Sequence, residues 1–236
     1  MAKPPLAGKC VHCLTENVER NWDHIFADAW YPETTPKDME RWQIPSCLSC
    51  NSEYGKLEND LLGRLGLCLD PNHSDTAEIV QKALRAANPK YAKSDRDHAA
   101  RTARAKKLNN QMRGGKEIPR KNAYPGLEER WGRPETAGVS ISLPVESVRR
   151  LAQKIVRGIC YREDKQFIEP PQVIIVVDPS HDTVADIRAT LDASSTNYAR
   201  KPGFIVRRAV LDDEVATQFF EITIWSIFVI YATVTT

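Results

Sequence analysis

The chain has 236 residues and a formal net charge of +2. This length allows one large domain or two smaller ones. With 42% hydrophobic and 27% charged residues, the composition is typical of a globular protein and excludes wholesale disorder. Because the net charge is small, it gives no sign of a nucleic-acid partner. Any such signal must come from where the charges lie along the chain.

The N-terminus and the most apolar stretch indicate where in the cell the protein is expected. The first eight residues lack the continuous apolar segment of a secretory signal. Residues 219–234 are shorter than the roughly 20 residues of a membrane helix and are rich in β-branched and aromatic residues, so we expect strands and no membrane contact. Six cysteines without an export signal indicate a reducing cytoplasm, where paired cysteines bind metal more often than they form disulfides. We therefore expect a cytoplasmic protein.

Residues 8–70 form the first expected domain, because they hold two Cys-x-x-Cys units. The four cysteines are Cys10, Cys13, Cys47 and Cys50. Together they can supply four thiolates to one tetrahedral zinc ion, which leaves no open position for chemistry. So short a segment has a thin core, and a structural zinc would supply folding energy. The remaining two cysteines, Cys68 and Cys160, are expected to be core residues.

The second expected segment, residues 71–138, is helical and basic. Apolar residues at helical spacing predict a helix over 75–87, and an Ala-, Arg- and Lys-rich stretch predicts a more polar one over 94–112. Glycines and prolines in residues 114–138 indicate a linker. Residues 90–121 contain eleven Lys or Arg against three acids, and these cations could neutralise DNA phosphates. The candidates are Arg101, Arg104, Lys106, Lys107, Arg113, Lys116, Arg120 and Lys121.

Residues 139–236 form the third expected segment, an α+β domain with a mainly antiparallel sheet. An amphipathic pattern over 144–159 predicts a helix, and a second helix is expected over 182–193. The expected strands are 173–177, 204–210, 219–225 and 227–234. This segment carries no catalytic motif, so its role is target recognition, self-association or contact with a partner protein. The residues do not choose among these roles, and the overall fold class is α+β.

The insert between the cysteine pairs contains Asn21-Trp22-Asp23-His24-Ile25, and the second pair runs directly into Asn51, with Lys56 five residues later. Cys-x-x-Cys, Asp-His-Ile and Cys-x-x-Cys-Asn in this order resemble the HNH, or ββα-metal, nuclease superfamily over about residues 8–62. In that family a β-hairpin presents an acidic residue followed by His, and a helix packed on the hairpin supplies a further metal ligand. The resemblance implies a zinc-stapled ββα-metal domain and a metal-dependent DNA endonuclease. It also implies a phage-defence, restriction or mobile-element system.

The residue types suit phosphodiester hydrolysis. His24 is the expected general base, because an imidazole can accept a proton from water near neutral pH. Asp23 and Asn51 offer hard oxygen ligands for a catalytic Mg²⁺ or Mn²⁺, and Glu58 is the one helix carboxylate that could add to them. Neighbouring residues of a regular strand point to opposite faces. A bulge or the end of the hairpin must therefore re-aim Asp23 or His24.

The sequence departs from the family pattern at two positions and leaves two other functions open. Trp42 stands where many members have an Asn that orients the catalytic His, and Asn51 stands where many have a His. The first alternative function is a non-catalytic, zinc-stapled DNA-binding protein. The second is a nuclease subunit that is active only inside a larger complex.

Overall fold

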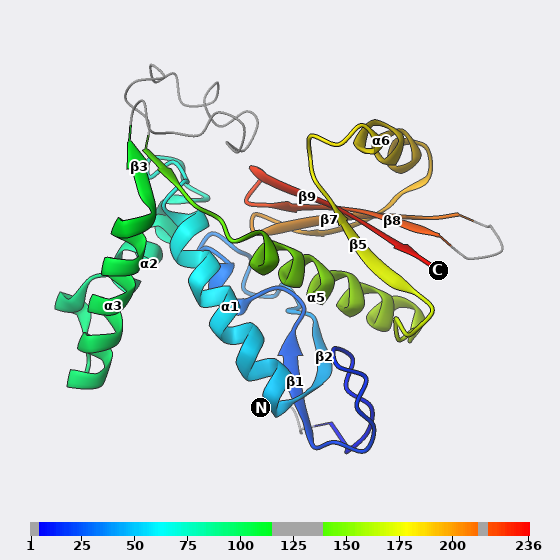
Figure 1. The fold of residues 1–236 in the computed structure, drawn as a ribbon, viewed down its shortest axis with the longest axis horizontal. Helices are drawn as coiled ribbons and strands as arrows, with labels where there is room; N and C mark the ends of the chain where they lie inside the picture. The colour runs from blue at the N-terminus through cyan, green and yellow to red at the C-terminus, as the bar shows by residue number, and fades with distance from the viewer. Residues whose placement is uncertain (1–4, 115–138, 212–216) are drawn as a thin grey trace. The chain divides into compact units, whose positions relative to one another are not determined.

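The computed structural model describes residues 5–114, 139–211 and 217–236 (Figure 1). Long-range packing divides the chain into two compact units. One contains Met1–Glu58 and Glu146–Thr236, and the other contains Asn59–Val145. This grouping differs from the three consecutive segments expected from the sequence, because the C-terminal residues pack with the N-terminal ones. None of the helices in the described part of the chain combines the length and apolar character that a membrane crossing requires.

The N-terminal part of the first unit contains two strands followed by a helix. Strands β1 (Arg20–His24) and β2 (Gln43–Cys47) pair antiparallel, and α1 (Leu48–Gly66) follows β2 directly. A short 3-10 helix, η1 (Asp28–Trp30), lies in the connection between the strands. Pairing in the hairpin is one-to-one from Arg20↔Cys47 to His24↔Gln43. Of the two expected means of re-aiming Asp23 or His24, a bulge or the end of the hairpin, the bulge is absent from β1 and β2, and neighbouring side chains alternate between the two faces up to His24, the last residue of β1.

The C-terminal part of the first unit is a five-stranded antiparallel sheet in the order β5-β9-β8-β7-β6. Its strands are β5 (Val173–Val177), β6 (Thr196–Arg200), β7 (Phe204–Val210), β8 (Gln218–Ile224) and β9 (Phe228–Thr235). The expected mainly antiparallel sheet is confirmed. Strand β6, Thr-Asn-Tyr-Ala-Arg, was not expected because it lacks alternating apolar residues and is an edge strand made by its pairing with β7.

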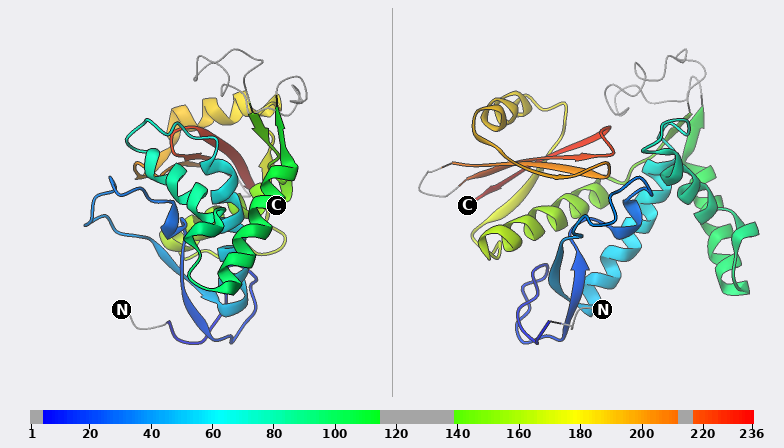
Figure 2. Two further views of the ribbon diagram at one scale, coloured as in Figure 1. Left: turned by 90° about the vertical axis from the view of Figure 1, so that its left-hand side faces the viewer. Right: turned by 180° about the vertical axis from the view of Figure 1, so that it is seen from behind.

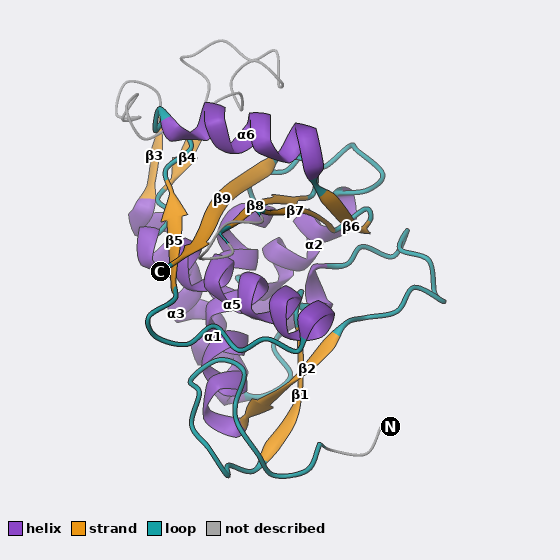
Figure 3. Cartoon of the chain, turned by 90° about the vertical axis from the view of Figure 1, so that its right-hand side faces the viewer, coloured by secondary structure: helices purple, strands orange, loops and turns teal. Residues whose placement is uncertain are grey.

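Two helices cover the two faces of this sheet, α5 (Val145–Asp164) on one and α6 (Thr183–Ser194) on the other (Figures 1 and 3). On the α6 face, Val184, Ile187 and Leu191 pack against Ala209 and Tyr231. Burying such side chains contributes about 1.5–3 kcal/mol each for the larger ones. Both helices lie close to their expected positions, since each has an apolar stripe at helical spacing.

The sheet shares a core with the N-terminal segment. The ring of Phe204 stacks on that of Phe26, with 4.5 Å between the centroids, and lies 5.8 Å from the ring of Trp30. The indole of Trp225 donates a hydrogen bond of 2.8 Å to the backbone carbonyl of Trp30. All four side chains are almost fully buried. This aromatic core explains why residues that lie far apart in the sequence fold as one unit.

The second unit contains the last part of α1 together with α2 (Ala77–Ala86), η2 (Pro89–Tyr91) and α3 (Asp95–Gln111). Figure 2 shows α2 and α3 in shades of green. Two short strands, β3 (Met112–Gly114) and β4 (Val139–Ile141), pair antiparallel. Helix α3 is polar, as expected, and Leu108 is its one buried residue. Ser94 caps its N-terminus by accepting a hydrogen bond from the backbone N–H of Asp97.

Candidate metal centre and the buried charge cluster

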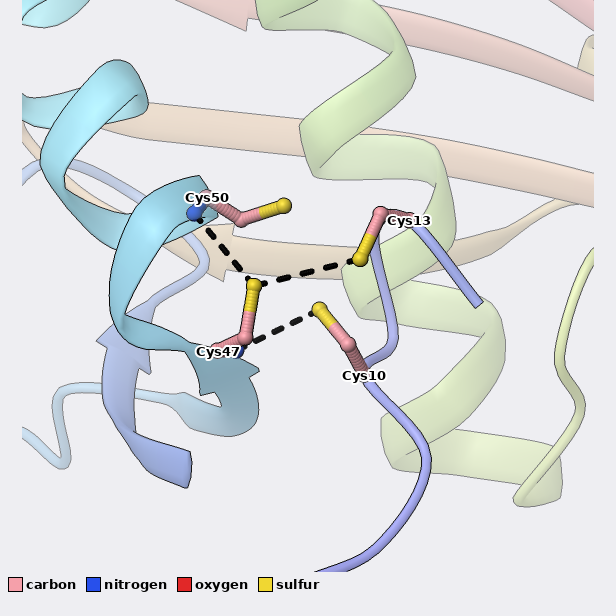
Figure 4. Close-up of side chains that lie close together, drawn as sticks. All are labelled: Cys10, Cys13, Cys47 and Cys50. Atoms are coloured by element: carbon pink, nitrogen blue, oxygen red, sulfur yellow. Dashed lines mark hydrogen bonds between the residues drawn. The ribbon is translucent and has the colours of Figure 1, made fainter. Parts of the chain in front are cut away.

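The four paired cysteines converge at one point (Figure 4). Their Sγ atoms all lie within 4.8 Å of one another, and those of Cys13 and Cys47 are 3.8 Å apart. A tetrahedral zinc ion with Zn–S bonds of about 2.3 Å requires S–S distances of about 3.8 Å. The geometry therefore fits a zinc ion, and the cluster can hold one.

Local backbone structure positions these thiols. Cys10 and Cys13 lie in a turn in which Leu14 adopts a left-handed conformation and its N–H donates to the carbonyl of Cys10. Cys47 ends β2 and Cys50 lies in the first turn of α1. Backbone N–H groups of Cys47 and Cys50 donate to the sulfurs of Cys10 and Cys47, at 3.3 and 3.4 Å. Such N–H···S bonds stabilise thiolates, which are the species that bind zinc.

The thiols differ in acidity. Partial burial would raise the pKa of Cys13, but hydrogen bonds from the hydroxyl and backbone of Thr15 and from neighbouring thiols lower it to about 6. Burial raises the pKa of Cys68 to about 11 and that of Cys160 to about 12. Cys160 lies in the core, as expected, and Cys68 is partly buried. Neither belongs to the cluster of metal-binding thiols found among the described residues.

Asp23 lies on the inner face of β1 and is only 4% exposed. Its Oδ2 atom is 2.9 Å from Nε2 of His12, and its Oδ1 atom accepts a hydrogen bond of 3.0 Å from Nζ of Lys154. Lys154, on α5, is 0% exposed and also donates to the carboxylate of Glu58. These four residues, His12, Asp23, Glu58 and Lys154, form a buried charge cluster. A buried ammonium between two carboxylates is stable because each charge is paired.

The close approach of α5 to β1 places Lys154. Gly158 lies one turn after Lys154, and a Cβ atom at this glycine would meet Cγ1 of Ile25 at 2.9 Å. Because Gly158 has no side chain, the helix can lie against the end of β1. Lys154 falls on the buried stripe of α5 together with Leu151 and Ile155. A lysine on an apolar helical stripe is the sequence signal that could have identified it.

Burial and neighbouring charges shift the pKa values of the residues in the cluster. Burial would raise the pKa of Asp23, but His12 and Lys154 outweigh burial and lower it. Burial raises the pKa of Glu58, and Lys154 offsets this only in part. Burial also lowers the pKa of His12, although Asp23 opposes the effect. Asp23 is therefore the fully ionised partner of Lys154.

The catalytic Mg²⁺ or Mn²⁺ expected at Asp23 and Asn51 does not fit this arrangement. Both oxygens of Asp23 are already bonded, and the ammonium of Lys154 lies between Asp23 and Glu58. Asn51 is on α1, where its Nδ2 donates 3.3 Å to the backbone carbonyl of Trp22. A divalent cation would have to displace Lys154 to reach these carboxylates. His12 and Lys154 were not predicted to take part in this site.

His24 lies on the other face of β1 from Asp23. Its Nε2 atom is 3.0 Å from Nε2 of Gln43, its cross-strand partner. Burial lowers the pKa of His24 below its usual 6.5, and the charges of Asp28 and Asp23 offset only part of this effect. The imidazole is therefore neutral at pH 7 and can accept a proton. The structure does not bring His24 and Asp23 to one face.

Trp42 lies between two guanidinium groups. The Cζ atoms of Arg162 and Arg200 are 4.1 and 3.6 Å from the centroid of its ring, and its Nε1 donates to Glu40 at 3.1 Å. Arg162 is on α5 and Arg200 on β6, so this stack joins the hairpin to the C-terminal elements. Cations over an indole face are attracted by its quadrupole.

Several of the predicted phosphate contacts have structural partners in the second unit. Arg101 pairs with Asp97 at 2.9 Å, and Arg104 donates 2.6 Å to the backbone carbonyl of Ala86 at the end of α2. Lys107 pairs with Asp60 at 2.8 Å.

Arg113 donates to the backbone carbonyls of Asn110 and Met112, at 2.9 Å each. Lys106 is exposed on α3. Lys116, Arg120 and Lys121 lie outside the described residues. DNA contact by the basic segment therefore stays a prediction.

Comparison with known proteins identified no relative: no family model, curated protein or solved structure matches this chain. The function is therefore argued from the residues themselves.

Proposed function

We propose that this chain is an HNH-type nuclease that hydrolyses phosphodiester bonds in DNA with His24 as the general base. One observation carries the proposal: two antiparallel strands, β1 and β2, run directly into α1, beside a four-cysteine cluster that can hold zinc. The Asp-His pair stands at the end of β1 and Asn51 in the first turns of α1. This is the order of elements that the ββα-metal resemblance implies.

The chemistry assigned to His24 requires a neutral imidazole. In the proposed reaction, His24 removes a proton from water, the water oxygen attacks phosphorus, the bond from phosphorus to the sugar oxygen breaks, and the leaving sugar oxygen takes up a proton from solvent. The lowered pKa of His24 keeps it in the accepting form at neutral pH. No step is assigned to Mg²⁺ or Mn²⁺, because Lys154 holds the carboxylates that would bind them.

A second candidate function is a non-catalytic, zinc-stapled protein that binds nucleic acid. The observation that favours it is the buried ammonium of Lys154, which pairs with both Asp23 and Glu58 and lies between these two candidate metal ligands. A cleavage assay separates the two candidates.

The experiment measures nicking of supercoiled plasmid and cleavage of circular single-stranded DNA by the zinc-loaded protein, with Mg²⁺, with Mn²⁺ and with no added metal. The nuclease proposal predicts cleavage that His24→Ala lowers by at least about 100-fold, the usual scale for losing a general base. His98→Ala, which removes an exposed histidine of α3, is the matched control and should cleave like the wild type. Zinc content and circular dichroism show whether each variant is folded.

Each outcome decides the assignment. A folded His24→Ala protein that cleaves like the wild type would overturn the role of His24. A zinc-loaded wild type that binds DNA but nicks nothing under any of the three conditions would overturn the nuclease proposal in favour of the second candidate. Cleavage only with added metal would keep the nuclease proposal and overturn its metal-free form.

A further inference from the structure

A hollow of about 300 Å³ lies on the hairpin face that carries His24. Arg20, Trp22 and His24 occupy alternate positions of β1 and therefore share this face, opposite the one that buries Asp23. Gln43, which contacts the imidazole of His24 at 3.0 Å, lines the hollow. We call this hollow the hairpin pocket. Its lining includes Arg20, Trp22, Gln43, Tyr161, Arg162 and Lys165.

Arg20 places a fixed positive charge in the hairpin pocket. Its guanidinium donates to the backbone carbonyls of Leu6 and Lys9, at 2.7 and 3.0 Å. A Cβ atom at Gly8 would meet this guanidinium at 2.9 Å, so glycine is needed for it to lie there. Both acceptors are neutral carbonyls. The positive charge of Arg20 therefore remains available to an anion.

Lys165 adds a second cation. It follows the end of α5 with a φ of 57°, and its ammonium donates 3.1 Å to the backbone carbonyl of Arg162. Within the described ranges, no carboxylate is paired with Lys165. Arg162, by contrast, is paired with carboxylates, because Glu40 lies 3.1 Å and Glu163 3.4 Å from its guanidinium. In the part of the chain that the structure describes, the hairpin pocket thus has two cations, Arg20 and Lys165, without a paired carboxylate.

Two aromatic side chains line the same hollow. Trp22 and Tyr161 are both partly buried, and the ring of Phe167 holds Tyr161 in an edge-on contact at 5.1 Å between centroids. An aromatic face can stack on any base, and this stacking is tolerant of sequence. Cations beside aromatic rings form the usual recognition surface for an unpaired nucleotide, whose base is free to stack.

We propose that the hairpin pocket binds a nucleotide of a single-stranded polynucleotide, its phosphate near Arg20 and Lys165 and its base against Trp22 or Tyr161. The inference rests on the proposed function, because it assigns the substrate to the face that carries His24. A base inside a duplex is stacked and paired, so a duplex cannot offer it to the hollow. DNA and RNA share the chemistry recognised here, and the test includes both.

The test measures fluorescence anisotropy of labelled oligo-dT, oligo-U and a blunt duplex with zinc-loaded protein and no added divalent metal. Single strands should bind more tightly than the duplex, with an affinity that falls as salt rises. Lys165→Gln and Trp22→Ala should each weaken binding, roughly tenfold for loss of a stacking aromatic. Lys37→Gln, which removes an exposed lysine from the connection between β1 and β2, is the matched control and should bind like the wild type.

A cross-linking measurement keeps the test decisive if Trp22→Ala is unstable. An oligonucleotide that carries 5-iodouracil should cross-link to the wild-type peptide containing Trp22 or Tyr161. Unchanged binding by a folded Lys165→Gln protein together with cross-links elsewhere would overturn the inference, as would equal binding of the duplex. Pocket-dependent binding without any nicking would overturn the nuclease proposal and leave the hairpin pocket standing. If the pocket variants still nick DNA and bind oligonucleotides as tightly as the wild type, the hairpin-pocket inference is overturned and the nuclease proposal stands.

Discussion

Lys154 donates a hydrogen bond of 3.0 Å to Asp23, although 131 positions separate the two residues in the chain. Both are almost fully buried, and the ammonium also pairs with Glu58. The contact joins α5 to the Asp-His strand, so the residue expected to bind a metal is held by a cation from the protein itself. The stability and the chemistry of the hairpin therefore depend on a residue far outside the motif.

The buried ammonium leads to the first prediction. Lys154→Met keeps most of the side-chain volume but removes the ammonium that Asp23 and Glu58 share, which leaves Asp23 with His12 alone, and we expect the free energy of unfolding to fall by about 3–5 kcal/mol. Urea denaturation measures it. Lys56→Met, at an exposed position of α1, is the control and should change stability little.

A rescue experiment checks the physical reason. Adding Asp23→Asn and Glu58→Gln to Lys154→Met removes the two carboxylate charges that have lost the ammonium, and should restore part of the lost stability. If the single variant is as stable as the control, the ammonium does not hold this cluster together.

The second prediction concerns the cysteine cluster. Cys47→Ser removes one of four ligands, and the bound zinc should fall well below one equivalent. Structural zinc contributes on the order of 10 kcal/mol in zinc-finger peptides, so a melting temperature lower by about 10 °C is a modest expectation. Cys68→Ser, outside the cluster, should keep its zinc. Full zinc occupancy in Cys47→Ser would contradict the four-thiolate site.

A third prediction follows from the lowered pKa of His24. As the pH falls through 6.5, the unfolded chain binds a proton at His24 that the folded chain binds only at lower pH. The unfolded state then holds more protons, so stability decreases as the pH falls below this value. We expect His24→Gln to lose less stability than the wild type between pH 7 and 5, as measured by urea denaturation at each pH. Parallel curves for the two proteins would show that His24 is not the group responsible.

The fourth prediction concerns the stack around Trp42. Trp42→Leu removes the aromatic ring that lies between Arg162 and Arg200 and leaves a gap, so we expect a loss of about 2–4 kcal/mol in stability. Trp42→Phe keeps an aromatic face and should lose less. Thermal unfolding compares the two variants. Equal losses would mean that packing volume alone, and no cation–π contact, sets the role of Trp42.

Sequence patterns fixed the local elements, because each depends on residues close together in the chain. The doubled Cys-x-x-Cys spacing predicted a cluster that the structure assembles within 4.8 Å, and period-2 and period-3.6 patterns predicted most helices and strands. The motif also placed Asp23 and His24 at the end of a strand.

Only the tertiary structure decided what surrounds those residues. The one-to-one register of β1 and β2 sends Asp23 inward and His24 to the opposite face, and the approach of α5 at Gly158 brings Lys154 to Asp23. Spacing could not reveal this pairing, because burial makes an unpaired charge so costly that its partner is chosen by packing across the whole unit. The sequence by itself thus determined the four thiols that can hold zinc and the Asp-His strand, whereas packing determined that a lysine holds the aspartate.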